Sequence, residues 1–201
     1  MYSAIRSLHD RFVLERRAEV LSRLLAGLLP SNAEVLDVGC GDGLIGHLIE
    51  RNKPTLRVCG LEVMPRPSSH IECLSYDGKT IPMKDSSFDV CLFVDVLHHT
   101  LNIEELLGEA RRVTRRYVLL KDHVCAGLYD RAALSLMDWV GNRPHGVCLP
   151  YNYQSKEGWE RIFRACAFQI VKWNQDISLY PLPFKWLFGR GMHCIVLLEK
   201  K

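Results

Sequence analysis

The sequence has no apolar run that approaches the ~20 residues needed to cross a bilayer. Its N-terminus also lacks the apolar centre and the small-residue cleavage site of a secretory signal. Five arginines between positions 6 and 23 suggest a mitochondrial transit peptide, but acids at 10, 15 and 19 interrupt them, and such peptides are poor in acids. We therefore expect a cytoplasmic protein with no membrane span.

Charge of one sign is not in large excess either. Lys and Arg number 26 against 23 Asp and Glu, a margin too small for a general attraction to nucleic-acid backbones or anionic membranes. The eight cysteines form no Cys-x-x-Cys pair, and several lie inside apolar runs. This predicts reduced, buried thiols rather than disulfides or a zinc knuckle. We expect no nucleic-acid partner.

Internal repeats, low-complexity tracts and long polar linkers are absent as well. A chain of 201 residues with 48% hydrophobic content is long enough for one well-buried core and short for two. We therefore predict a single domain over residues 1–201.

What the sequence does contain is an alternation of short apolar runs and helical patterns. The runs that indicate strands are Glu34–Val38, Arg57–Val63, Ile71–Tyr76, Asp89–Val96, Tyr117–Lys121, Phe168–Trp173 and His193–Leu198. Helical spacing is found at Ala18–Leu29, from Leu44 to Ile49, and at Ile103–Val113, Gly127–Val140 and Lys156–Ala165. This order predicts an α/β fold: a Rossmann-like, seven-stranded, mostly parallel sheet with helices on both faces and an antiparallel last strand.

The ligand crevice of such a sheet lies beyond the carboxyl ends of its strands. The first strand ends in Gly39, Gly41 and Gly43, which allow the backbone to turn tightly and approach a ligand at the start of the next helix. A carboxylate would suit the free N–H groups there. A glycine turn alone is equally typical of a plain tight turn.

Acidic residues end the next strands. Glu62 stands 25 residues after Asp37, close to the spacing at which nucleoside-binding folds place a carboxylate for the ribose hydroxyls. Asp77 ends the third strand, where a carboxylate can accept from an adenine amine, and Asp95 follows the fourth strand. Each residue alone is more typical of a turn or a solvated strand end. Their order and spacing together predict a nucleoside site.

Four stretches resemble the motifs of class I S-adenosylmethionine-dependent methyltransferases. They are VLDVGCGDG at 35–43, YDGKTIPMKDSSFDV at 76–90, VDVLHH at 94–99 and EARRV at 109–113. Within that family they resemble the branch of ubiquinone and menaquinone biosynthesis methyltransferases. The similarity covers roughly residues 30–125 and is specific as a set.

The resemblance implies S-adenosylmethionine as cofactor and methyl transfer to a small-molecule acceptor, with an O-, N- or C-nucleophile left open. It divides the chain into an N-terminal helical cap (1–30), a cofactor-binding half (31–125) and a substrate-side half (126–201). The cofactor-binding residues that it implies are Asp37, Gly39, Cys40, Gly41, Glu62, Val63, Asp77, Gly78, Asp95, Val96 and His98.

The sequence departs from the family pattern at two places. Between Glu62 and Ile71 the family has a full helix, whereas the prolines of residues 64–69 oppose one here, so one face of the adenosine pocket is expected to be built differently. Before the fifth strand, residues 113–117 replace the usual proline and paired glycines, which we interpret as a shortened turn.

The sulfonium of the cofactor makes its methyl group electrophilic, so the protein mainly has to align a nucleophile and exclude water. A hydroxyl acceptor would benefit from a base, for which the imidazoles of His98, His99 and His123 are available, with His123 and His98 as the predicted catalytic residues. The pair His98-His99 also fits a helix start that packs near the cofactor. The side chains between Asp95 and His123 include metal-ligand types, but no element carries ligand spacing. We therefore expect no metal.

The acceptor is predicted to lie between the fifth-strand loop, the helix that follows and the irregular stretch 141–155. Its predicted contacts are His99, Asp122, Tyr129, Asn142, Tyr151 and Tyr153, with Asp138, Trp139, His145 and Asn152 in the same cluster. Helical spacing favours a core position for Trp139, and Trp159 is assigned to packing. Residues 2–12 are a candidate lid over the cofactor, and the apolar residues 180–188 suggest either a homodimer contact or a substrate entrance.

Three other functions compete with this interpretation. A nicotinamide dehydrogenase shares the glycine turn and Glu62, but its Gly-x-Gly-x-x-Gly spacing is not met. A catalytically idle subunit that binds S-adenosylmethionine is the closer alternative. An RNA methyltransferase is expected to add a basic patch or an RNA-binding module, and neither is evident.

Overall fold

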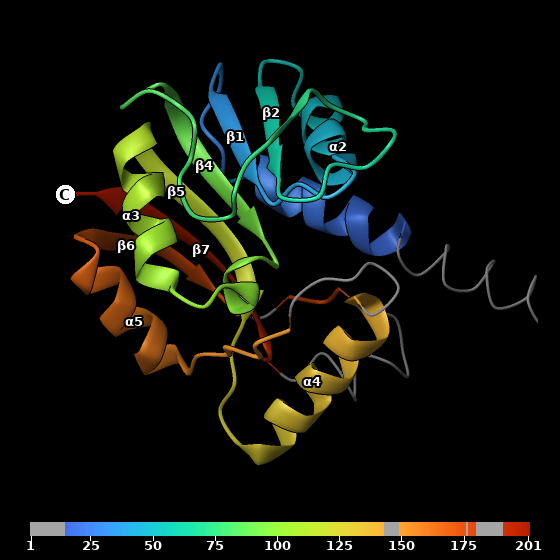
Figure 1. Ribbon diagram of the computed structural model, residues 1–201, viewed down its shortest axis with the longest axis vertical. Helices are drawn as coiled ribbons and strands as arrows, with labels where there is room; N and C mark the ends of the chain where they lie inside the picture. The colour runs from blue at the N-terminus through green and yellow to red at the C-terminus, as the bar shows by residue number, and fades with distance from the viewer. Residues whose placement is uncertain (1–14, 143–148, 176, 180–190) are drawn as a thin grey trace, which may run out of the picture.

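The computed structural model describes residues 15–142, 149–175, 177–179 and 191–201 (Figure 1). Its strands are β1 (Glu34–Val38), β2 (Arg57–Glu62), β3 (Cys73–Ser75), β4 (Phe88–Val94), β5 (Thr114–His123), β6 (Phe168–Asn174) and β7 (His193–Lys200). Its helices are residues 15–26, α2 (Leu44–Asn52), the 3-10 turn η1 (Leu97–His99), α3 (Ile103–Val113), α4 (Leu128–Asn142) and α5 (Lys156–Ala165).

The described strands form one seven-stranded sheet in the order β3-β2-β1-β4-β5-β7-β6. The pairings among β1 to β5 are parallel, and β7 runs antiparallel to both β5 and β6. The predicted fold class, with its antiparallel last strand, is therefore confirmed.

Each face of the sheet has its own apolar core, because successive side chains of a strand point to opposite faces. On one face the residues of α3 and α5 pack against Leu36, Phe93 and Leu120. On the other face Leu21 of the first helix and Ile49 of α2 pack against alternate residues of the same strands. Figure 1 shows these helices on the two sides of the sheet.

Helix α4 lies apart from both cores, past the carboxyl end of β5 (Figure 1). Its Leu134 packs into a small third cluster with Tyr153 and Met192. The prediction that Trp139 is a core residue is wrong, because the side of α4 that carries Leu134 packs against the protein. Trp139 lies on another side of the helix and is 46% exposed. Trp159 on α5 is fully buried, as expected.

Both sequence departures have a structural counterpart. No helix forms between β2 and β3, since residues 63–72 are bends and coil. Helix α3 ends at Val113 and β5 begins at Thr114, so the shortened turn becomes part of the strand. A register shift between Phe88 and Val90 lets β4 pair with the longer β5.

Membrane-spanning helices are not found among the described residues. The seven cysteines within the described part of the chain are free thiols, of which Cys91 and Cys194 are buried.

Candidate functional site

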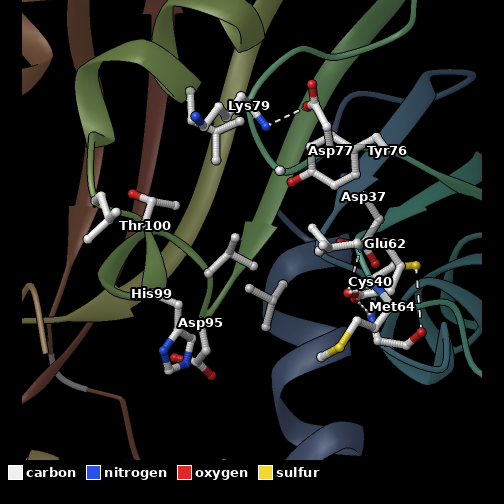
Figure 2. Close-up of a pocket in the computed structure, with 18 of the residues that line it drawn as sticks. Asp37, Cys40, Glu62, Met64, Tyr76, Asp77, Lys79, Asp95, His99 and Thr100 are labelled. Atoms are coloured by element: carbon white, nitrogen blue, oxygen red, sulfur yellow. Dashed lines mark hydrogen bonds between the residues drawn. The ribbon is translucent and has the colours of Figure 1, made fainter. Parts of the chain in front are cut away.

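A cavity of about 690 Å³ opens at the carboxyl ends of β1, β2 and β4, where the sequence predicted a ligand crevice. Figure 2 shows Asp77 and Lys79 at one end of this cavity and Asp95 and His99 at another. The lining residues that the sequence also predicted are Asp37, Gly39, Cys40, Gly41, Glu62, Val63, Asp77, Gly78, Asp95, Val96 and His99.

The glycine loop after β1 leaves room for a ligand and for close packing beneath it. Gly39 has a φ of 76°, and a Cβ atom there would lie 2.6 Å from Val96, so a larger residue does not fit. Gly41 has a φ of 61° and nothing within 4 Å of an added Cβ. Gly43 precedes α2 and provides no side-chain cap, and Asp42 Oδ1 accepts from the Leu44 amide at 3.1 Å. The first turn of α2 contains no acid, so the positive end of its dipole still favours a ligand carboxylate beside the glycine loop.

Backbone amides hold Glu62 at the end of β2. One carboxylate oxygen accepts from the Gly41 amide at 2.8 Å, and the other accepts from the amides of Val63 at 2.8 Å and Met64 at 3.2 Å. These bonds fix the carboxylate beside the glycine loop, as Figure 2 shows. In that position it can accept hydrogen bonds from ribose hydroxyls.

Asp37 is a buried acid whose Oδ1 atom lacks a hydrogen-bond partner within the described structure, although it lines the cavity. Burial, together with the neighbouring charge of Glu62, raises the pKa of Asp37 to about 7. An unpaired buried carboxylate is costly unless a ligand supplies a donor. The ammonium group of a bound methionine moiety is such a donor.

Asp77 holds the turn after β3. Its Oδ1 atom accepts from the amides of Lys79 at 2.8 Å and Thr80 at 2.7 Å, and these bonds hold the pKa of Asp77 below its usual value. The carboxylate is therefore an anion with its second oxygen available to an adenine amine.

Apolar side chains complete the cavity wall near these acids. Val63 and Met64 are 48% and 46% exposed, and Leu101 is 85% exposed, yet all three line the cavity. The loop that replaces the family helix supplies Met64, so this face is built from a segment of bends and coil. A bound adenosine would cover this apolar surface. Together with Asp37, Glu62 and Asp77, the wall fits S-adenosylmethionine.

Asp95 marks the far side of the cavity, at the bend between β4 and η1, where its φ is 57°. Its carboxylate pairs with Arg17 of the first helix and with the buried Lys121 of β5. Burial alone would raise the pKa of Asp95, but these two cations hold it well below its usual value. Arg17 also lines the cavity. No local sequence pattern indicates Arg17, because its partner Asp95 lies 78 residues away.

His98 is placed differently from its prediction. It is fully buried, it is not among the residues that line the cavity, and its Nδ1 atom lies 2.7 Å from Asp122. Burial alone would lower the pKa of His98, but Asp122 and Asp138 outweigh it and raise the pKa to about 10. A protonated ring has no lone pair to accept a proton, so this position does not support a cofactor contact or a general base.

His123 and Asp122 also lie behind the cavity wall. Asp122 is fully buried and accepts from the amides of Leu97 at 3.1 Å and His123 at 2.7 Å. Burial, and next the charge of Lys121, lower the pKa of His123. Neither side chain lines the cavity, so the structure supports a structural role for Asp122 rather than a substrate contact. The predicted catalytic role of His123 stays a prediction.

His99, the neighbour of His98, does line the cavity. Burial, with the adjacent charge of His98, lowers the pKa of His99 to about 4. Its Nδ1 atom is buried and makes no hydrogen bond within the described structure. His99 is thus a neutral imidazole beside the ligand space, and of the three candidate histidines it is the one that faces this space.

Of the predicted acceptor residues on and after α4, those whose side chains the structure describes do not line this cavity. Tyr153 is buried and donates to Asp138, Tyr151 is half-buried with a φ of 54°, and Tyr129 is 51% exposed. The side chain of Asn142, His145, the proposed lid 2–12 and the apolar residues 180–188 fall outside the described part of the chain. The wall instead contains several residues that sequence reasoning missed: Arg17, Arg66, Thr100, Leu101, Asn102 and Glu105.

Comparisons with known proteins agree with this geometry. The family described as "Methyltransferase domain" matches residues 8–172. A search of curated proteins finds no match to the chain.

Solved structures that resemble the chain have low sequence identity to it. A chain from the complex of the Trm112 methyltransferase activator and a methyltransferase of Haloferax volcanii is 14% identical, with 95% of this chain and 93% of that chain covered and a TM-score of 0.69. An S-adenosylmethionine-dependent methyltransferase of Thermotoga maritima is 20% identical, with coverages of 100% and 98% and a TM-score of 0.61. One from Mesorhizobium loti is 14% identical, with coverages of 91% and 98% and a TM-score of 0.63.

Identities this low show the fold, whereas the family match spans most of the chain. The predicted ubiquinone-like branch is not distinguished from other branches by these matches. At the level of the family the assignment is direct: the chain belongs to the methyltransferase-domain family and is a methyltransferase.

Proposed function

We propose that this methyltransferase transfers the methyl group of S-adenosylmethionine to a small-molecule acceptor held beside Arg17, His99 and Thr100. The observation that carries the proposal is the shape of the site. One cavity of about 690 Å³ contains both the acids suited to the cofactor and this second group of polar side chains. Its volume falls within the range of about 300–1,000 Å³ that is typical of small-ligand pockets.

In this proposal each acid of the cofactor wall has one task. Asp37 accepts from the methionine ammonium, Glu62 from the ribose hydroxyls and Asp77 from the adenine amine. Gly41 leaves open space over the loop, as an added Cβ there would meet nothing within 4 Å. When bound, S-adenosylmethionine supplies an electrophilic methyl group, so the chain has to hold the acceptor in line and exclude water.

The other wall orients the acceptor. His99 is neutral, with a pKa lowered to about 4, so it accepts a hydrogen bond from an acceptor O–H or N–H group but is a weak base. Arg17 attracts an acceptor that carries negative charge, although Asp95 already holds part of its guanidinium. The accepting atom, whether oxygen, nitrogen or carbon, is left open by these groups.

Calorimetric titration with S-adenosylmethionine tests the cofactor half of the proposal. Glu62→Gln and Asp77→Asn should each weaken binding about 10- to 100-fold, because a hydrogen bond to a charged group contributes about 1.5–3 kcal/mol. Glu72→Gln is the matched control, since Glu72 is exposed and does not line the cavity. If S-adenosylmethionine binds both variants as tightly as it binds the wild type, the proposed cofactor site is contradicted.

A screen of small acceptors with labelled S-adenosylmethionine tests the transfer itself. Label should pass to a small molecule, and His99→Ala should raise the KM for that molecule more than the KM for the cofactor. If the protein binds S-adenosylmethionine but transfers label to no class of acceptor, a catalytically idle subunit that binds S-adenosylmethionine becomes the better interpretation. Transfer to RNA or protein alone would overturn the small-molecule proposal.

A further inference from the structure

Behind the cavity wall, three potential metal ligands meet from two elements that are far apart in the sequence. They are His98 Nε2 and His99 Nδ1 of η1, and Asp138 Oδ2 of α4. All three atoms lie within 4.8 Å of one another. No spacing in the sequence predicts this cluster, because its ligands come from two elements, η1 and α4.

The two imidazole nitrogens are buried without a hydrogen-bond partner in the described structure. His98 Nε2 lies 3.3 Å from Asp138 Oδ2, an ion-pair distance. His98 itself is fully buried and Asp138 is 7% exposed. In the metal-free protein His98 is protonated and faces Asp138 as its ionic partner, so a metal ion would displace the proton on Nε2. Buried polar atoms are normally satisfied, so His99 Nδ1 is the nitrogen of this cluster that indicates a missing partner.

The distance suits a metal ion as that partner. Ligands at about 2.0–2.1 Å from a tetrahedral Zn²⁺ are separated by roughly 3.3 Å from one another. The distance between His98 Nε2 and Asp138 Oδ2 matches this separation between two ligands. Two histidines and one carboxylate also form the donor set of many catalytic zinc sites, which keep one position open.

The surrounding groups orient these ligands in the way that metal sites require. The other ring nitrogen of His98 lies 2.7 Å from Asp122, which is itself fixed by two backbone amides. This bond fixes the ring so that Nε2 points toward Asp138, where a metal ion would take the place of its proton. The Tyr153 hydroxyl donates to Asp138 and orients it. Carboxylate–histidine–metal chains of this kind are a regular feature of metal sites.

We propose that His98, His99 and Asp138 bind a divalent transition metal, with Zn²⁺ as the best fit. The second set of potential ligands, Asp95, His98 and His123, is a poorer site because the Lys121 ammonium already occupies Asp95. The open fourth position would face the ligand space, since His99 lines the cavity.

The metal has a consequence for methyl transfer, and this part rests on the proposed function. An acceptor hydroxyl or thiol bound at the open position would lose its proton to water more easily, because the metal stabilises the anion. The anion would then be the nucleophile. Metal binding itself requires only the three side chains.

Cobalt titration of the full-length, chelator-treated protein tests the site. One equivalent of Co²⁺ should give the visible absorption of a four- or five-coordinate ion, and Zn²⁺ should displace it. His99→Ala and Asp138→Asn should each weaken binding at least tenfold, and Tyr153→Phe about 10- to 100-fold as an orienting group. His47→Gln with His70→Gln is the matched control, since these rings form another histidine pair, 5.8 Å apart, outside the cluster.

Binding of S-adenosylmethionine to Asp138→Asn checks that this variant is folded, because Asp138 does not line the cavity. Wild-type protein that gives no cobalt absorption at one equivalent overturns the metal site, as does absorption that is unchanged in His99→Ala and Asp138→Asn. Cofactor binding and methyl transfer would survive either of these results, so failure of the metal site is distinguishable from failure of the proposed function.

Discussion

Asp37→Asn is the substitution for which the structure predicts both the sign and the size of an effect. Asp37 is 1% exposed, and one of its oxygens has no partner in the described structure. Burial and the charge of Glu62 raise its pKa from 3.8 to about 7. At 1.36 kcal/mol for each unit of pH, ionisation of Asp37 costs the ligand-free fold up to about 4 kcal/mol.

The direction with pH follows from that raised pKa. The protonated carboxyl is favoured in the folded state, so the penalty is absent below the unfolded pKa of 3.8. It grows as the pH rises from 3.8 to about 7 and is constant above. An asparagine never ionises, but its unpaired amide costs about 1–3 kcal/mol. We therefore expect Asp37→Asn to stabilise the ligand-free protein by about 1–3 kcal/mol at pH 8, and by less at pH 5.

Urea unfolding of both proteins between pH 5 and pH 8 measures this difference. All other titrating groups are shared, so the pH dependence of the difference in unfolding free energy belongs to Asp37. Asp42→Asn in the same loop is the control, since Asp42 is exposed. A difference that stays constant from pH 5 to pH 8 would refute the reasoning.

Three further predictions follow from the same site. At pH 6.5, binding of S-adenosylmethionine should release a proton from the wild-type protein and none from Asp37→Asn, because the ammonium group of the ligand favours the charged form of the Asp37 carboxylate. Calorimetry in buffers of different ionisation enthalpy measures the number of protons released, and equal release by both proteins would contradict the prediction. Gly39→Ala should lower the free energy of unfolding by about 2–4 kcal/mol and abolish cofactor binding, because a φ of 76° and the Val96 contact at 2.6 Å both oppose a side chain; denaturation and titration check it, and unchanged binding would count against the loop geometry. In metal-free protein, the stability contributed by His98 should be complete below pH 6.5 and lost as the pH rises through about 10. Urea unfolding should therefore give a difference in unfolding free energy between wild type and His98→Gln that declines over this pH range, and a constant difference would argue against a buried imidazolium.

The cofactor side of the site was predictable because each of its signals is local. Gly39 and Gly41 indicate a tight loop, and Glu62 and Asp77 come at the ends of apolar runs. In a parallel sheet the ends of such runs meet at one edge, so the glycine loop, Glu62 and Asp77 become neighbours once the fold class is known. The prolines of residues 64–69 likewise predicted the missing helix, because proline restricts the backbone wherever it stands.

The rest of the site was decided only by tertiary structure. His98 and His99 are adjacent, yet η1 directs one into the core between two aspartates and the other to the cavity wall, and no sequence pattern encodes that choice. Arg17 reaches Asp95 only because the first helix packs beneath the sheet. The sequence by itself determined the sheet and the cofactor acids, which depend on local periodicity and strand ends. The charge pairs and the histidine roles depend on long-range packing, and only the folded chain brings those groups together.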